Sequence, residues 1–134
     1  MNYKYSTVFV IIMLAVALLI ATGCKKNGND YTQKDVAEFA KCLTDKGAVM
    51  YGAFWCPHCA NVKKKFGSAF QFITYVECDP RGENSKSDLC IKKGIQNYAT
   101  FEFSDGSRLV GEPTWEEMGV KTGCLVPGGE QLSS

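Results

Sequence analysis

The sequence lacks a surplus of charge of either sign, and it contains no internal repeat or low-complexity tract. Fifteen lysines and arginines are balanced by fourteen aspartates and glutamates, which leaves a formal net charge of +1. No broad basic surface is therefore expected, and nucleic-acid binding is a poor explanation for the chain. Only four prolines and thirteen glycines occur in 134 residues, which excludes a collagen-like fibre. The length fits one globular domain plus a short extra segment.

Cysteine is the residue type that the chain has in excess. Seven cysteines are more than an ordinary cytosolic enzyme carries and fewer than a disulfide-rich toxin would need. Six of them follow residue 24: Cys42, Cys56, Cys59, Cys78, Cys90 and Cys124. Six cysteines allow many alternative pairings, so their spacing alone does not fix the disulfides.

The amino-terminal segment 1–23 has the layout of a secretory signal. Residues 7–21 are uncharged and mostly large and apolar, and Lys4 precedes them. A spanning helix needs roughly 20 apolar residues, so this run is short for a permanent anchor. Small residues at 21–23 lead into Cys24, which resembles a bacterial lipobox. The resemblance implies that Cys24 is lipidated; the alternative is an uncleaved anchor with a free thiol.

These features predict four segments and a location. A signal peptide (1–23) is followed by a polar spacer (24–30), a folded domain (31–124) and a flexible tail (125–134). The mature chain is expected outside the cytoplasm and tethered to a membrane, as a bacterial lipoprotein. Cysteines in such an oxidising compartment can form disulfides.

The pattern of apolar residues in 31–124 predicts an α/β domain. Helical spacing occurs in 32–46, 60–66, 87–93 and 114–122, where Thr114 and Glu117 form a capping box. Strand-like runs occupy 48–54, 72–78, 100–103 and 108–110, the last two joined by a two-residue turn at Asp105-Gly106. The strand–helix–strand order implies a parallel pair, and the closing hairpin adds antiparallel strands. The prediction is a mixed four-stranded sheet with helices on both faces, a thioredoxin-like fold.

The sequence Cys56-Pro57-His58-Cys59 places two thiols at the start of the second helix. Backbone N–H groups at a helix N-terminus favour negative charge and hence the thiolate of Cys56. Pro57 suits the first turn because its missing N–H would have no helical partner there, and a protonated His58 would further stabilise the thiolate. A stabilised thiolate is a good leaving group, which makes the disulfide more oxidising. Cys56 is therefore the candidate nucleophile, and Cys59, expected to be more buried, would resolve the mixed disulfide.

Residues 51–59, YGAFWCPHC, resemble the signature of the thioredoxin superfamily, and their Pro-His pair is similar to that of periplasmic Dsb-type oxidases. With YVECDP at 75–80 and Gly-Glu at 111–112, they resemble the thioredoxin-like domain associated with bacterial vitamin K epoxide reductase homologues. The resemblance covers nearly all of 31–124. It implies disulfide exchange with secreted proteins that carry cysteine pairs, and reoxidation by a quinone-linked membrane partner of the vitamin K epoxide reductase type. It also implies a disulfide between Cys78 and Cys90.

One loop departs from the superfamily pattern. The segment Tyr98-Ala99-Thr100 corresponds to the substrate loop, in which the superfamily has a cis-proline where this chain has Ala99. A cis peptide before alanine costs roughly 2.5 to 4 kcal/mol, so a trans, reshaped loop is expected. In the family this loop binds the substrate backbone and keeps metal ions off the thiols, and the substitution would alter both properties.

Other roles for the cysteines and aromatic residues lead to a second hypothesis. Zinc bound by Cys56 and Cys59 would need Cys78 and Cys90 as ligands, whose spacing is too wide for a typical zinc site. No metal or cofactor is therefore expected. Whether Cys42 and Cys124 form a disulfide is left open.

The aromatic residues before Cys56 are expected mostly in the core, with only Trp55 beside the active site. The main hypothesis is a membrane-tethered thiol–disulfide oxidoreductase; the alternative is a non-catalytic module that uses the same fold to bind a partner or a metal.

Overall fold

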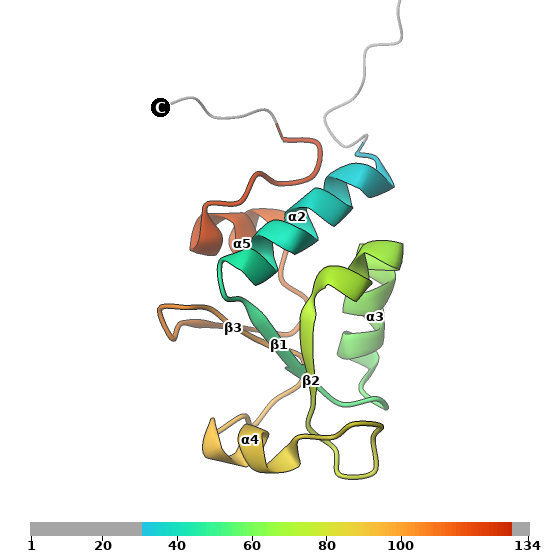
Figure 1. Ribbon diagram of the computed structural model, residues 1–134, viewed down its shortest axis with the longest axis vertical. Helices are drawn as coiled ribbons and strands as arrows, with labels where there is room; N and C mark the ends of the chain where they lie inside the picture. The colour runs from blue at the N-terminus through green and yellow to red at the C-terminus, as the bar shows by residue number, and fades with distance from the viewer. Residues whose placement is uncertain (1–30, 130–134) are drawn as a thin grey trace, which may run out of the picture.

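Residues 31–129 are described by a computed structural model of the protein (Figure 1). The predicted signal peptide, Cys24, the spacer to residue 30 and the tail from residue 130 lie outside the described residues. The elements are α2 (Gln33–Asp45), β1 (Val49–Gly52), α3 (Pro57–Phe66), the 3-10 helix η1 (Gly67–Phe72), β2 (Thr74–Glu77), α4 (Ser87–Lys92), β3 (Thr100–Glu102), β4 (Arg108–Val110) and α5 (Trp115–Thr122). Within 31–129, none of the helices has the length and apolar character needed to cross a bilayer.

The four strands form one mixed sheet in the order β2-β1-β3-β4. β1 pairs in parallel with β2, and α3 lies in the connection between them. β3 pairs antiparallel with both β1 and β4. The predicted sheet, with its parallel pair and its closing hairpin, is confirmed.

Local sequence signals set the ends of two helices. The Thr32 hydroxyl accepts a hydrogen bond from the Asp35 backbone, and the Asp35 carboxylate accepts one from the Thr32 backbone, which forms a capping box before α2. Thr114 and Glu117 make the same exchange before α5. Gly123 ends α5 with φ of 73°, a left-handed conformation that glycine adopts without a steric penalty. These boundaries follow from residues close in sequence.

Three predicted boundaries differ from the structure. The apolar pattern places the second helix at 60–66, whereas α3 begins at Pro57, as expected from the Cys-Pro-His-Cys motif; η1 follows it where no helix was expected. The β3–β4 turn is also wider than the two-residue turn predicted: Phe103 donates to the carbonyl of Ser107, and Gly106 donates to that of Phe103. Gly106 has φ of 79°, whereas Asp105 does not have a positive φ. A turn centred on Ser104 and Asp105, closed by glycine, replaces the predicted Asp-Gly pair.

The two faces of the sheet bury different cores, because successive strand residues point to opposite faces. Met50 of β1 and its cross-strand partner Phe101 pack against α2, α3 and α5. The helical residues on that side are Val36, Phe39, Ala40, Leu43, Val62, Phe66, Trp115 and Met118. Tyr51 and Val76 belong to a second cluster, with Leu89 and Cys90 of α4. Helices therefore cover both faces, as predicted.

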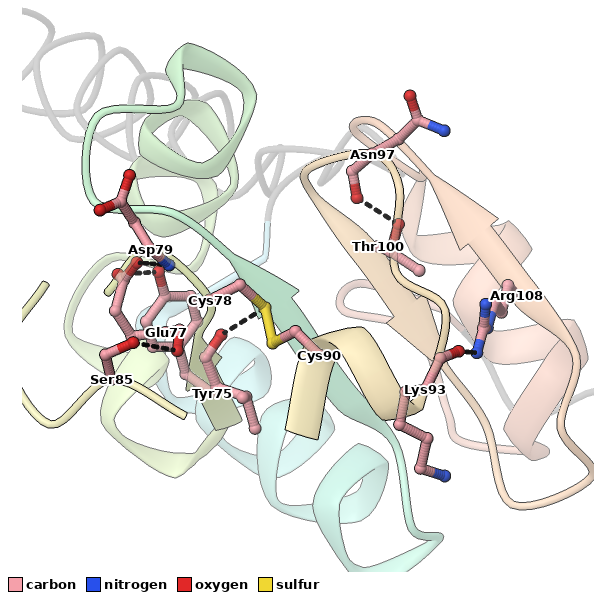
Figure 2. Close-up of a disulfide and its surroundings, with 11 residues drawn as sticks. Tyr75, Glu77, Cys78, Asp79, Ser85, Cys90, Lys93, Asn97, Thr100 and Arg108 are labelled. Carbon is pink, nitrogen blue, oxygen red and sulfur yellow. Dashed lines mark hydrogen bonds between the residues drawn. A yellow bond between two sulfur atoms is a disulfide. The ribbon is translucent and has the colours of Figure 1, made fainter. Parts of the chain in front are cut away.

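Two disulfides connect these layers. Cys42 of α2 is bonded to Cys124, which follows α5, so the two helices are held side by side at one end of the domain (Figure 1). Cys78, at the end of β2, is bonded to Cys90 of α4 (Figure 2). The remaining cysteines of the described chain, Cys56 and Cys59, are free thiols.

Candidate active site

The two free thiols lie at the N-terminal end of α3. Cys56 is the N-cap residue, and its carbonyl accepts the first helical hydrogen bond from the Ala60 backbone at 3.0 Å. Pro57 occupies the first helical position, where no N–H is needed. The exposed fraction is 4% for Cys56 and 1% for Cys59, so both residues are buried within the larger core cluster. The fold thus brings one sulfur to the helix tip and the other one turn further into the core.

Burial gives Cys59 a thiol that holds its proton strongly. Burial is the main cause that raises the pKa of Cys59 to about 12; the neighbouring Cys56 side chain raises it further, while a backbone hydrogen bond at Ala53 and the charge of Lys63 lower it. At neutral pH Cys59 is therefore almost entirely a thiol. It must lose a proton to attack a disulfide and gain one when it leaves.

This pKa predicts a pH-dependent difference in alkylation. In the reduced protein at pH 8, the raised pKa keeps Cys59 almost entirely in the thiol form. We expect iodoacetamide to label Cys59 extremely slowly, at a rate that rises about tenfold per pH unit with no plateau below pH 10. Mass spectrometry of a Cys56→Ser variant follows Cys59 alone. The same variant unfolded in guanidinium is the control, because its Cys59 thiol is then exposed; a plateau near pH 8 in the folded variant would contradict the prediction.

The loop opposite the thiols differs from its predicted conformation. The peptide bond between Tyr98 and Ala99 is cis, so the expectation of a trans, reshaped loop was wrong. Ala99 is completely buried in the same cluster as Cys56 and Cys59, and its carbonyl accepts a hydrogen bond from the Gly111 backbone at 2.8 Å. The Thr100 hydroxyl donates to the carbonyl of Asn97 at 2.7 Å (Figure 2). The cis conformation therefore occurs in a loop held by the Gly111–Ala99 and Thr100–Asn97 hydrogen bonds, without a proline ring.

An ionic cluster fixes the segment that leads into this loop. The Glu102 carboxylate pairs with Lys93 at 2.7 Å and with Arg108 at 2.6 Å. Arg108 also donates to the Lys93 carbonyl at 2.6 Å (Figure 2). Burial acts to raise the pKa of Glu102, but hydrogen bonds from the two cations outweigh it and lower that pKa. The cluster ties the end of α4 to the β3–β4 hairpin.

Two exposed aromatic residues directly precede Cys56 in the sequence. Phe54 and Trp55 are each 55% exposed, so the expectation that Phe54 lies mostly in the core was wrong. Trp55 donates from Nε1 to Asp79 at 2.7 Å, and its ring meets the edge of Tyr98 at a centroid distance of 6.2 Å. Arg81 lies 5.8 Å from the Phe54 ring centroid and also binds Asp79. Hydrogen bonds from Arg81, and then from Trp55, hold the pKa of Asp79 well below its usual range.

His58 has a partner that sequence reasoning missed. Its Nδ1 lies 2.7 Å from Oε1 of Glu112, which also accepts a hydrogen bond from Asn61 at 2.9 Å. Asn61 first, and then His58, lower the pKa of Glu112 through these hydrogen bonds. Glu112 is 54 residues from His58 in the sequence, so no local pattern predicts their contact. Glu112 was noted only as part of the Gly-Glu pair at 111–112 in the family resemblance.

Two of the three consecutive lysines of α3, Lys63 and Lys65, lie over aromatic rings. Lys63 lies 4.2 Å from the Tyr75 ring centroid, and Lys65 lies 4.2 Å from that of Trp115. Lys65 also donates to the Pro113 carbonyl at 2.7 Å. Lys63 and Lys65 are partly buried, whereas Lys64 is exposed.

No cluster that could bind a metal lies around the thiols. In the described part of the chain, no group of three or more His, Cys, Asp and Glu side chains is arranged so that it could hold a metal ion. Cys78 and Cys90, the only further ligands that the zinc hypothesis offered, are bonded to each other. The arrangement of Cys56 and Cys59 is therefore that of a dithiol that can close to a disulfide.

Comparison with known proteins supports a redox role. Over 88 residues the chain is 39% identical to the thiol-disulfide oxidoreductase LTO1 of Arabidopsis thaliana. The match covers 63% of this chain and 23% of that protein, so the chain spans about a quarter of the length of this curated relative. No family model matches the chain. Together with the fold, the similarity supports a thioredoxin-like redox domain.

Proposed function

We propose that this chain is an extracytoplasmic, membrane-tethered thiol–disulfide oxidoreductase in which Cys56 and Cys59 are the redox-active pair. One observation carries the proposal. Among residues 31–129, four cysteines are joined in disulfides, and the two that remain free lie one turn apart at the N-terminal end of α3. A helix N-terminus stabilises a thiolate at its cap, which suits Cys56 for nucleophilic attack and for departure.

Oxidation of a client protein then proceeds in two exchanges. A client thiolate attacks the Cys56 sulfur of the Cys56–Cys59 disulfide; the new S–S bond joins client and Cys56, and Cys59 leaves with the electron pair and takes up a proton. A second client thiolate attacks the client sulfur of this mixed disulfide, and Cys56 leaves as a thiolate. The client gains one disulfide, and the protein is left with two thiols. An electron acceptor must restore its disulfide.

The exposed aromatic residues before Cys56 support binding to unfolded clients. Phe54 and Trp55, the two residues before Cys56 in the sequence, expose apolar ring surface, and the ring of Trp55 contacts that of Tyr98 edge-on. Exposed aromatic patches of this kind occur at binding sites more often than elsewhere on a soluble protein. We propose secreted proteins with cysteine pairs as the clients and a quinone-linked membrane protein of the vitamin K epoxide reductase type as the reoxidising partner.

Trapping of a mixed disulfide tests the proposed function. A reduced Cys59→Ser variant, incubated with a peptide that contains one disulfide, should accumulate about one covalent adduct per chain. The disulfide is one that joins two separate peptides: Cys56 attacks one sulfur, the other peptide leaves with its thiol, and the variant lacks the Cys59 thiol that would resolve the adduct. Mass spectrometry before and after dithiothreitol measures the adduct, and a Cys56→Ser, Cys59→Ser double variant is the matched control. If neither the adduct nor disulfide exchange by the unmodified protein is seen, the chain is the non-catalytic binding module.

A further inference from the structure

The connection from β4 to α5 runs along one face of α3. In this connection, Glu112 accepts two hydrogen bonds at the same Oε1 atom, from Asn61 at 2.9 Å and from Nδ1 of His58 at 2.7 Å. One turn further along the helix, Lys65 donates to the Pro113 carbonyl at 2.7 Å. The three donors are spaced three and four residues apart, so they lie on the same face of α3. The connection is therefore bonded to the helix whose first turn carries the dithiol.

The same connection is also bonded to the substrate loop. Gly111 directly precedes Glu112, and its backbone N–H donates to the Ala99 carbonyl at 2.8 Å. Ala99 is completely buried in the cluster that contains both free thiols. Tyr98, the residue before it, contacts the ring of Trp55 edge-on. Two adjacent residues, one bonded to α3 and the other to the substrate loop, thus link the dithiol helix to that loop.

We propose that Glu112 is a positioning residue that holds the substrate loop at the correct spacing from the Cys56 sulfur for extended peptide clients. The proposal rests on the proposed function and deepens it, because it names a residue that determines how strongly a client peptide binds. A client cysteine has to reach Cys56 at the tip of α3 while the client backbone lies along the substrate loop, so the spacing between helix and loop matters. Glu112 takes no part in the bond exchange and acts only through this spacing.

Other contacts keep the connection in place when the Glu112 side chain is removed. Pro113 is buried, and Trp115 packs edge-on against two phenylalanine rings of the core. Lys65 keeps its bond to the Pro113 carbonyl and lies 4.2 Å from the Trp115 ring centroid. Glu112 itself is exposed, so its truncation leaves no cavity in the core. A variant at this position is therefore expected to fold and to loosen only the link to the first turns of α3.

A glutamine separates the hydrogen bonds of Glu112 from its charge. A carboxylate can only accept, so His58 donates from Nδ1, and the amide oxygen of Glu112→Gln can accept from both His58 and Asn61. Glu112→Ala loses the same charge and both bonds. Asn61→Ala removes one of the bonds from the other partner. Exposed Glu116→Ala is the matched control, because it removes one negative charge from the first turn of α5.

The first measurement compares a peptide client with a small thiol in single-turnover reactions. Preoxidised protein is mixed with increasing concentrations of a reduced, unstructured two-cysteine peptide, quenched with acid and analysed by mass spectrometry. We expect Glu112→Ala to raise the half-saturating peptide concentration about tenfold with little change in the limiting rate. Asn61→Ala should raise it by less. The Asn61→Ala, Glu112→Ala double variant should be no worse than Glu112→Ala, because the contact between the two residues is already lost.

The small thiol tests whether the effect depends on a client backbone. The compound is 2-mercaptoethanol, which has none. Glu112→Ala and Glu112→Gln share the loss of charge, so their disulfides should be reduced by it at rates within about twofold of each other. With the peptide, in contrast, Glu112→Gln and Glu116→Ala should match the unmodified protein.

The second measurement follows the Gly111 amide and needs no redox reaction. The Ala99 carbonyl protects this amide from hydrogen exchange, which NMR of the oxidised protein records. We expect Glu112→Ala to speed its exchange at least about fivefold, while Glu112→Gln and Glu116→Ala leave the rate unchanged. Melting temperatures of all variants show whether the fold as a whole has been weakened.

The outcomes separate this proposal from the proposed function. Unchanged peptide half-saturation in Glu112→Ala overturns the proposal, and so does equal impairment of Glu112→Gln, which assigns the effect to charge. Equal losses with peptide and 2-mercaptoethanol also overturn it, because they indicate damage at the tip of α3. If the unmodified protein reacts with neither compound, the proposed function is wrong, and the Gly111 exchange rates alone then decide the link. Weaker peptide binding in Glu112→Ala that Glu112→Gln restores supports the proposal.

Discussion

Cys56→Ser is expected to lower the rate of dithiol oxidation by at least about a thousandfold, because the variant lacks the sulfur that forms the mixed disulfide. A serine hydroxyl at the α3 N-cap cannot carry the exchange, since oxygen forms no disulfide. It can still cap the helix, so the fold is expected to persist. The measurement is the loss of free thiols in a reduced two-cysteine peptide, with preoxidised protein and a quinone or oxidised glutathione as oxidant.

Cys59→Ser separates attack from resolution in the same assay. This variant should lose turnover to a similar extent, yet it keeps Cys56 and should form a single adduct with a disulfide. Equal activity of Cys56→Ser and the unmodified protein would show that the exchange takes place elsewhere in the chain. Loss of both turnover and cooperative unfolding would instead assign Cys56 a structural role.

Removal of the Cys42–Cys124 disulfide is expected to lower the free energy of unfolding by about 4 kcal/mol. The bond joins residues 82 apart in sequence and so restricts much of the unfolded chain. In Cys42→Ala, Cys124→Ala protein, urea unfolding should show a lower midpoint. Redox activity at 25 °C should remain, because neither cysteine belongs to the free dithiol at the start of α3.

The second disulfide supplies the matched comparison. Cys78 and Cys90 are only 12 residues apart, so the same loop-entropy argument gives about 3 kcal/mol for their removal. The larger loss is therefore expected for the Cys42–Cys124 pair. The reverse order of stability losses would mean that packing around Cys78 and Cys90, rather than restriction of the unfolded chain, decides the contribution of each bond.

The family resemblance and local geometry predicted different parts of the site. The position of Cys56 at a helix start followed from the Cys-Pro-His-Cys spacing, and the structure places it at the N-cap. The conformation before Ala99 was wrongly expected to be trans, because residue preference alone was considered. Ala99 is buried and its carbonyl is held by Gly111, which are contacts that no local rule contains. Phe54 was likewise placed in the core because it continues an apolar run, although the strand has ended before it.

The sequence by itself determined the features that depend on near neighbours: the capping boxes at Thr32 and Thr114, the order of strands and helices, and two cysteines one helical turn apart. Tertiary structure decided the pairing of Cys42 with Cys124 and the contact of His58 with Glu112. It also brought Tyr75 and Cys59 to the same side of Gly52. Capping and apolar periodicity act within one turn or one strand, so they can be read along the chain. Contacts between residues distant in sequence depend on the register of the sheet and on how the helices pack against the sheet. Many residues determine that register and packing together, so these contacts cannot be read from a local pattern.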